Sequence, residues 1–163
     1  VLNVRVHRLW PGQIVIIADA AEPVALWHDG KEWTVVDGLG RIMPDARAGD
    51  YKALVRLAGQ GAPTAAPQLV NALKKAPDVS ARLAIATRIA DRRWDVRLVN
   101  GATVRLPEDD AMDGALARLS TLQTRTALMQ RPVTMIDLRN KGRIYLSPAQ
   151  GGTARKIAEA ARS

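Results

Sequence analysis

Residues 93–106, RWDVRLVNGATVRL, alternate apolar and polar side chains on both sides of the pair Asn100-Gly101. This alternation is typical of strands with one buried face, and a glycine between two such runs indicates a hairpin. A two-residue turn at Asn100-Gly101 would set charged side chains opposite apolar ones. A three-residue loop over 99–101, with Gly101 left-handed, keeps the faces separate, and a slip of one residue would reverse them. The predicted pairs are Trp94 with Leu106, Val96 with Val104, Leu98 with Ala102 and, on the solvated face, Asp95 with Arg105.

Shorter alternating runs, separated by glycine and proline turns, continue in both directions from this hairpin. Segment 82–89 is ambiguous because its alanines permit a helix, but its alternation favours a strand. Near the end of the chain, a left-handed Gly142 in the loop Asn140-Lys141-Gly142 predicts a second clear hairpin. Its predicted pairs are Leu138 with Ile144 and Ile136 with Leu146, and Asp137 faces Tyr145. The predicted strands are 2–6, 13–18, 24–27, 33–36, 41–43, 53–57, 82–89, 93–98, 102–106, 133–139 and 143–146.

Two segments have helical rather than alternating patterns. A helix is predicted over 67–75, with Pro67 in its first turn, where a proline is tolerated. A longer helix is predicted over 110–129, with apolar side chains on one face and acidic residues at its start. Many short strands with one or two helices predict an α+β fold that is mainly an antiparallel β domain of hairpins.

Composition restricts the possible chemistry. The chain has 163 residues and no cysteine, which excludes disulfides, thiol catalysis and cysteine-bound zinc. Its longest apolar run, 14–18, is far shorter than the roughly 20 residues that span a bilayer. The chain begins at Val1, already inside a predicted strand, so we expect it to be a piece of a longer protein.

The net charge of +8 raises the question of an anionic partner. A nucleic-acid surface usually gathers its cations and places aromatic side chains among them. Here the arginines are spread from Arg5 to Arg162, and the densest group, 88–97, is interrupted by Asp91 and Asp95. This distribution favours a solvated basic surface over a nucleic-acid site. Binding to an anionic polymer, either nucleic acid or cell-wall material, stays as the alternative function.

The sequence contains few patterns typical of catalysis. The carboxylates at 108–110 stand at a predicted helix start, where capping explains them. The segment Gly38-Leu39-Gly40 opens no helix and so is not a nucleotide fingerprint. We expect Trp27, Trp33 and Trp94 to be core residues. The sequence therefore predicts no metal and no cofactor, and function by binding rather than catalysis.

Four motifs in order resemble the FtsQ/DivIB family of bacterial cell-division proteins. The Trp-Pro turn with its following strand and EPVALW (22–27) resembles the junction between a POTRA domain and a β domain. The motifs WTVVDGLGRI (33–42), RRWDVRL through VRLP (92–107) and IDLR (136–139) resemble that β domain's hairpins and closing strand. The resemblance implies the end of a POTRA domain at 1–23, a β domain at 24–148 and a flexible or helical basic tail at 149–163.

The resemblance also implies a function. FtsQ-type proteins are non-enzymatic scaffolds of the division machinery that hold the partners FtsB and FtsL. They are anchored in the inner membrane by a single transmembrane helix, with their folded part in the periplasm at the septum. This chain would be the periplasmic portion, without the anchor and the first half of POTRA.

The candidate site is the last predicted strand, 143–146, because it is the natural edge of the sheet and a partner strand can pair with an open edge. In the family, FtsB adds its strand there, and acidic residues of the partner would meet Arg139 and Arg143. The alternative is that these two arginines only protect an edge from aggregation. The contact residues implied by position are Arg139, Asn140, Gly142, Arg143, Ile144, Tyr145 and Leu146.

The chain departs from the family pattern at three places. Some members have an aromatic residue where this chain has Asn140, and a tryptophan at the end of the last strand, where it has Leu146-Ser147. Tyr145 is one position away and is the aromatic residue available to a partner. A charged pair common in the family is replaced by Ala20-Ala21.

Overall fold

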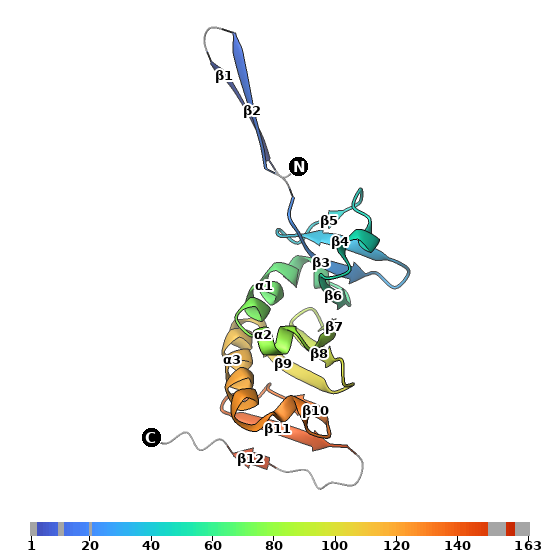
Figure 1. Cartoon of the computed structure of the whole chain (residues 1–163), viewed down its shortest axis with the longest axis vertical. Coiled ribbons are helices and arrows are strands. Elements are labelled where there is room, and N and C mark those ends of the chain that lie inside the picture. Colours follow the sequence, from blue (N-terminus) through green and yellow to red (C-terminus); the bar gives the residue numbers. More distant parts are fainter. Residues whose placement is uncertain (1–2, 10–11, 20, 150–155, 159–163) are drawn as a thin grey trace.

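The computed structural model describes residues 3–9, 12–19, 21–149 and 156–158. In these ranges, ten strands form one mixed sheet in the order β12-β11-β10-β9-β8-β7-β6-β3-β4-β5, and β1 and β2 form a separate hairpin (Figure 1). The strands are β1 Asn3–Leu9, β2 Gln13–Asp19, β3 Pro23–His28, β4 Trp33–Asp37, β5 Ile42–Met43, β6 Val55–Ala58, β7 Leu83–Ile89, β8 Arg93–Leu98, β9 Thr103–Glu108, β10 Val133–Asp137, β11 Arg143–Pro148 and β12 Lys156–Ala158. The helices are α1 Ala62–Lys74, α2 Pro77–Ser80, α3 Asp109–Thr126 and two 3₁₀ turns, η1 Ala48–Tyr51 and η2 Leu128–Gln130.

The α+β prediction is confirmed. Most neighbouring strands are antiparallel, but β3–β6, β6–β7 and β9–β10 are parallel pairs. The connections between parallel strands must cross over, and two of them contain α1 and α3. These helices cover one face of the sheet, α1 against β3 and β6 and α3 against β9 (Figure 1). The core lies between the helices and that face, with Trp94 fully buried in it.

The two hairpin registers predicted from alternation are confirmed. Val96 pairs with Val104 and Asp95 with Arg105, and Gly101 is left-handed with φ 87°. The predicted pair of Trp94 with Leu106 falls at a bulge between Arg93 and Asp95, where Pro107 adds a residue to β9 without an N–H to donate. In the last hairpin, Ile136 pairs with Leu146 and Asp137 with Tyr145, and Gly142 has φ 78°. Leu138 leaves the ladder and donates its N–H to the carbonyl of Arg105.

The helices differ from the predicted ranges at their ends. Helix α1 begins five residues earlier than predicted, at Ala62 after a left-handed Gly61, so Pro67 lies inside the helix instead of in its first turn. Burial of Ala62, Ala66 and Leu69 accounts for the longer helix despite the N–H that Pro67 lacks. Helix α3 ends at Thr126, because Ala127 is left-handed, and its predicted last residues form η2.

Trp33 is not a core residue, contrary to the prediction. It is 37% exposed and packs edge-on against His28, with the guanidinium of Arg56 over its ring. Trp27 is partly buried and donates its indole N–H to the carbonyl of Gly59. Trp33 lies on β4, next to the two-residue strand β5 at the end of the sheet, where no further strand covers it among the described residues.

Candidate functional site: the C-terminal hairpin

The terminal hairpin, β10 and β11, brings the predicted contact residues together. Loop residues Arg139, Asn140 and Gly142 and the first strand residue Arg143 are exposed. Ile144 is 5% exposed and belongs to the core, while Tyr145 and Leu146 are partly buried. Side chains alternate along a strand, so Ile144 and Leu146 face the helices, and Arg143 and Tyr145 lie on the opposite face.

The backbone of β11 has an inner and an outer side. The N–H of Arg143 donates to the Asn140 carbonyl at 3.3 Å, and the N–H of Ala149 donates to the Pro132 carbonyl at 2.9 Å. The first bond closes the hairpin loop, and the second reaches the residue just before β10. Since the N–H of Leu138 donates to Arg105 on β9, its neighbour Asp137 directs its backbone groups to Tyr145, its partner on β11, so the odd-numbered residues of β11 pair inward. By alternation, the N–H and C=O of Ile144 and Leu146 point outward, away from β10. These are the groups that an added strand would bond.

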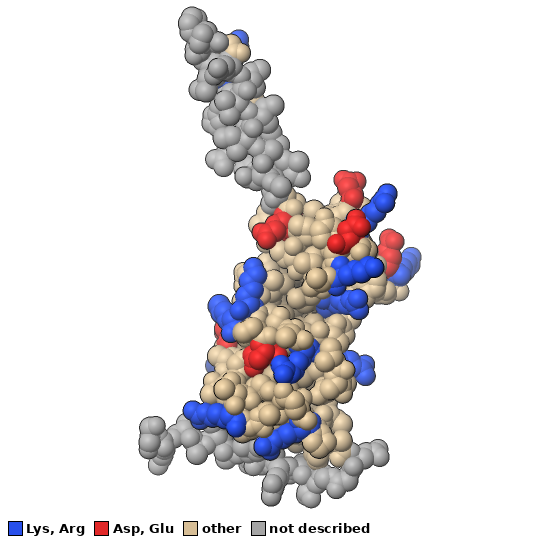
Figure 2. Space-filling model, in the orientation of Figure 1, with Lys and Arg blue, Asp and Glu red and all other residues tan. Residues whose placement is uncertain are grey.

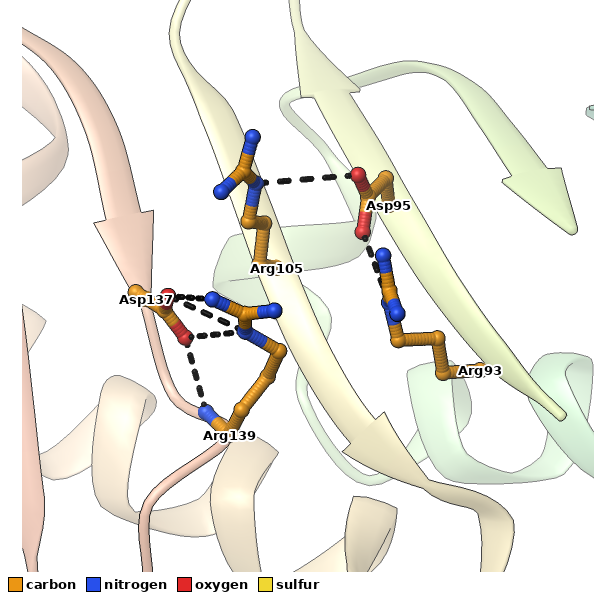
Figure 3. Close-up of polar contacts among 5 residues, drawn as sticks. All are labelled: Arg93, Asp95, Arg105, Asp137 and Arg139. Atoms are coloured by element: carbon orange, nitrogen blue, oxygen red, sulfur yellow. Dashed lines mark hydrogen bonds and ion pairs between the residues drawn. The ribbon is translucent and has the colours of Figure 1, made fainter. Parts of the chain in front are cut away.

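A row of charges crosses the open face of the sheet beside this hairpin (Figure 3). Asp95 on β8 pairs in register with Arg105 on β9, which pairs in register with Asp137 on β10. The side chains of Arg93 and Arg105 approach Asp95 with N–O distances of 3.7 and 3.8 Å. The row alternates with Val96, Val104 and Ile136, which belong to the core; the charges therefore lie on the face opposite the helices.

Arg139 is already engaged within the chain. Its Nε and Nη2 donate to the carboxylate of Asp137 at 2.6–3.0 Å, and its backbone N–H donates to the same carboxylate at 3.0 Å (Figure 3). Burial raises the pKa of Asp137, but the bonds from Arg139 outweigh it, and the net pKa lies below the ordinary value. The same bonds raise the pKa of Arg139. The positive charge of Arg139 is therefore partly compensated by the carboxylate of Asp137, whereas Arg143 has no ion-pair partner among the described residues.

A hollow of about 360 Å³ lies beside Arg139. Its charged lining is mixed: Arg92, Arg93, Arg139 and Lys141 stand with Glu108 and Asp110. These residues are not predicted to meet from the sequence, because the parallel pairing of β9 with β10 and the position of α3 bring them together. No local signal in the sequence reports that pairing.

The carboxylates at 108–110 are not a helix cap, contrary to the prediction. Glu108, at the N-cap position of α3, makes no capping bond. The carboxylate of Asp109 instead accepts two bonds of 2.6 Å from the guanidinium of Arg88, whose side chain is 4% exposed and stacks over Trp94. The bonds from Asp109 raise the pKa of Arg88. This pair joins the end of β7 to the start of α3 and has a structural role.

The edge beyond β11 is occupied by the chain itself. Strand β12 runs antiparallel to β11, with Arg143 opposite Ala158, Ile144 opposite Ile157 and Tyr145 opposite Lys156. The sequence predicts β11 at the edge of the sheet and a flexible or helical tail over 149–163. Residues 156–158 form a strand, and 150–155 and 159–163 lie outside the described residues.

The basic charge is dispersed over the face of the protein that Figure 2 shows. Lys and Arg side chains are scattered among acidic and uncharged ones on the face that Figure 2 shows, without a continuous basic area. No cluster of three or more metal-binding side chains occurs among the described residues. In the same part of the chain, no helix has both the length and the apolar character needed to cross a bilayer.

Comparison with known families agrees with the resemblance seen in the sequence. The family model described as "Cell division protein FtsQ/DivIB, C-terminal" matches residues 25–139, from β3 to the loop after β10. The chain belongs to the FtsQ/DivIB family. This is a family of cell-division proteins and not of enzymes.

Named relatives support the assignment. The chain is 40% identical over 156 residues to cell division protein FtsQ of Hirschia baltica, covering 94% of this chain and 53% of that protein. It is 30% identical over 148 residues to FtsQ of Rhizobium meliloti, covering 90% and 48%, respectively. The chain thus spans about half the length of these FtsQ proteins.

A solved structure is also similar. It is the major extracytoplasmic domain of the cell-division protein DivIB from Geobacillus stearothermophilus. The TM-score is 0.46 at 13% identity, and the match covers 68% of this chain and 98% of that one.

Proposed function

We propose that this chain is the periplasmic portion of a division scaffold that captures FtsB- and FtsL-type partners through β11. The observation that carries the proposal is the outward-facing backbone of Ile144 and Leu146 at the C-terminal end of an FtsQ/DivIB domain. A partner strand bonded to these groups would extend the sheet, with backbone bonds giving affinity and flanking side chains giving specificity. Family membership supports the scaffold role.

The proposal includes location and domain boundaries. The full-length protein is anchored in the inner membrane by one transmembrane helix and is located at the division septum, with this portion in the periplasm. Residues 1–23 are the end of a POTRA domain and 24–148 the β domain, followed by the tail. The family match over 25–139 and the separate pairing of β1 with β2 support this division.

The first test is a titration with a synthetic peptide from the periplasmic end of the cognate FtsB-type protein, followed by backbone amide NMR. We expect shifts concentrated in residues 139–147. Shifts confined to another surface would retain a scaffold function but reject this site. Absence of binding at high peptide concentration would reject the partner proposal.

A proline variant tests strand addition directly. Ile144→Pro removes an outward N–H and leaves the inward bonds of β11 intact, so we expect peptide binding to be lost. Ile144 is also a core residue, so Ile144→Val is the matched control. It lowers the free energy of unfolding by about 1 kcal/mol and keeps the backbone N–H. Circular dichroism must show that both variants are folded. A folded proline variant that binds as tightly as the valine variant contradicts the proposal.

Salt dependence separates this function from binding to an anionic polymer. Binding to a polyanion weakens steeply with salt, because contacts with its charges release counterions. A strand bonded through its backbone depends on salt much less. The dispersed charges in Figure 2 favour the second behaviour.

A further inference from the structure

The strand β12 lies on the same edge that the proposed partner would use. Its register sets Ile157 opposite Ile144, whose backbone groups point outward from β11. In an antiparallel pair, two opposite residues whose backbone groups point toward each other form two hydrogen bonds, each N–H donating to the other residue's carbonyl. The N–H and C=O of Ile144 are therefore bonded by the chain itself when β12 is in place. A partner strand cannot bond the same groups at the same time.

We propose that β12 is a built-in competitor that closes the partner edge and must leave before a partner strand can add. This proposal rests on the proposed function of β11. The described strand has three residues, against a usual five or six. Such a short strand protects the edge from unwanted pairing and yields to a longer partner strand.

The effect of this competition on the apparent Kd of a partner depends on how often β12 is in place. When binding requires an open state, the apparent Kd is the intrinsic Kd divided by the open fraction. A strand in place about half of the time weakens binding about twofold, and one in place about nine tenths of the time weakens it about tenfold. For occupancies in this range, removing β12 should tighten partner binding by the reciprocal of the open fraction, about twofold to tenfold.

Two proline variants form a matched pair within β12. Ile157→Pro removes the N–H directed at β11 and leaves the net charge unchanged. Ala158→Pro removes an N–H that points away, because its opposite residue, Arg143, is bonded inward. Proline is tolerated on an edge strand where its nitrogen faces outward. We expect the first variant to open the edge and the second to leave it closed.

Amide hydrogen exchange tests the closed edge without any partner. In the intact chain, the Ile144 amide should exchange slowly. It should exchange faster in Ile157→Pro and in a chain ending at Ala149, whereas Ala158→Pro should resemble the intact chain. The Tyr145 amide, which points inward, should be unchanged in all four proteins. Equal exchange at Ile144 in all four would overturn the proposal.

Calorimetric titration of the same four proteins with the FtsB-type peptide completes the test. Tighter binding by Ile157→Pro and by the shortened chain, but not by Ala158→Pro, supports the competition. Equal affinity in all four, with shifts at 139–147, overturns the competitor and retains the proposed function. If the peptide binds none of them while Ile144 exchange still responds to Ile157→Pro, β12 closes the edge but the proposed function fails, and with it the competition.

Discussion

The ion pair of Asp137 and Arg139 allows a prediction in which stability and partner affinity change in opposite directions. In Asp137→Asn, the carboxylate that accepts four contacts from Arg139 becomes a neutral amide. The Asp137 side chain is 10% exposed, but that of Arg139 is 42% exposed, so solvent screens the pair. We expect a loss of about 1–2 kcal/mol in the free energy of unfolding. For a domain of this size, that corresponds to a fall in Tm of about 2–8 °C.

Partner affinity should rise in the same variant. A partner carboxylate on Arg139 would lie about 6 Å from Asp137, where two unit charges repel by about 0.7 kcal/mol in water and about 3 kcal/mol at a dielectric constant of 20. A value of about 1 kcal/mol, toward the solvated limit, suits this exposed site. Its removal should tighten binding of an acidic peptide about fivefold.

The assay is calorimetric titration with the FtsB-type peptide, together with thermal melting. Asp95→Asn is the matched control, because it removes a charge from the same row two strands away. At roughly 10 Å that charge is largely screened, so affinity should change less than about twofold. If Asp137→Asn binds more weakly than the wild type while it stays folded, Arg139 does not meet an acidic partner group and the reasoning is refuted.

Three further predictions concern stability. The pKa of Asp137 is lower in the folded protein than in the unfolded chain. Its contribution to the free energy of unfolding is therefore complete above about pH 4 and is lost as pH falls through the folded pKa. In urea unfolding between pH 7 and 3, the wild type should lose more stability than Asp137→Asn. Asp109→Asn should cost about 3 kcal/mol, because it leaves the buried Arg88 charge with only the exposed carboxylate of Asp91, 3.7 Å away. Arg88→Met should cost less, because the 28% exposed Asp109 can hydrate; equal costs in urea unfolding would contradict this asymmetry. Gly59→Ala should cost about 3 kcal/mol or more, because φ is 95° and the new Cβ would overlap the Arg88 carbonyl. Gly30→Ala should cost about 1 kcal/mol, because its Cβ would enter open space. Similar melting temperatures for the two variants would show that the overlap is relieved.

Local patterns predicted the hairpins well. Alternation along 93–106 and 133–146 specified which side chains share a face, and a glycine able to adopt positive φ specified each loop. Both registers followed from these two local properties. The sequence therefore located the predicted contact residues in one loop and strand before the fold was known.

Long-range pairing was not predictable in the same way. The parallel pair β9–β10 joins strands separated by the whole of α3, and it alone places Arg139 near Arg92 and Arg93. The start of α1 was missed because Pro67 was assigned to a first turn, while burial of small apolar residues outweighs its lost bond. The strand β12 was missed because three residues in an alanine-rich segment carry no alternation long enough to detect.

The strand order also fixes the distance across the sheet from β3 to β11. From β3 to β11 there are six steps, through β6, β7, β8, β9 and β10. At about 4.8 Å a step, these strands lie roughly 29 Å apart. If the N-terminal side is tethered to the membrane as proposed, the sheet is a rigid spacer that fixes how far from the tether a partner is held. Insertion or loss of one strand between β3 and β11 would change that reach by about 5 Å while leaving the binding edge itself unchanged.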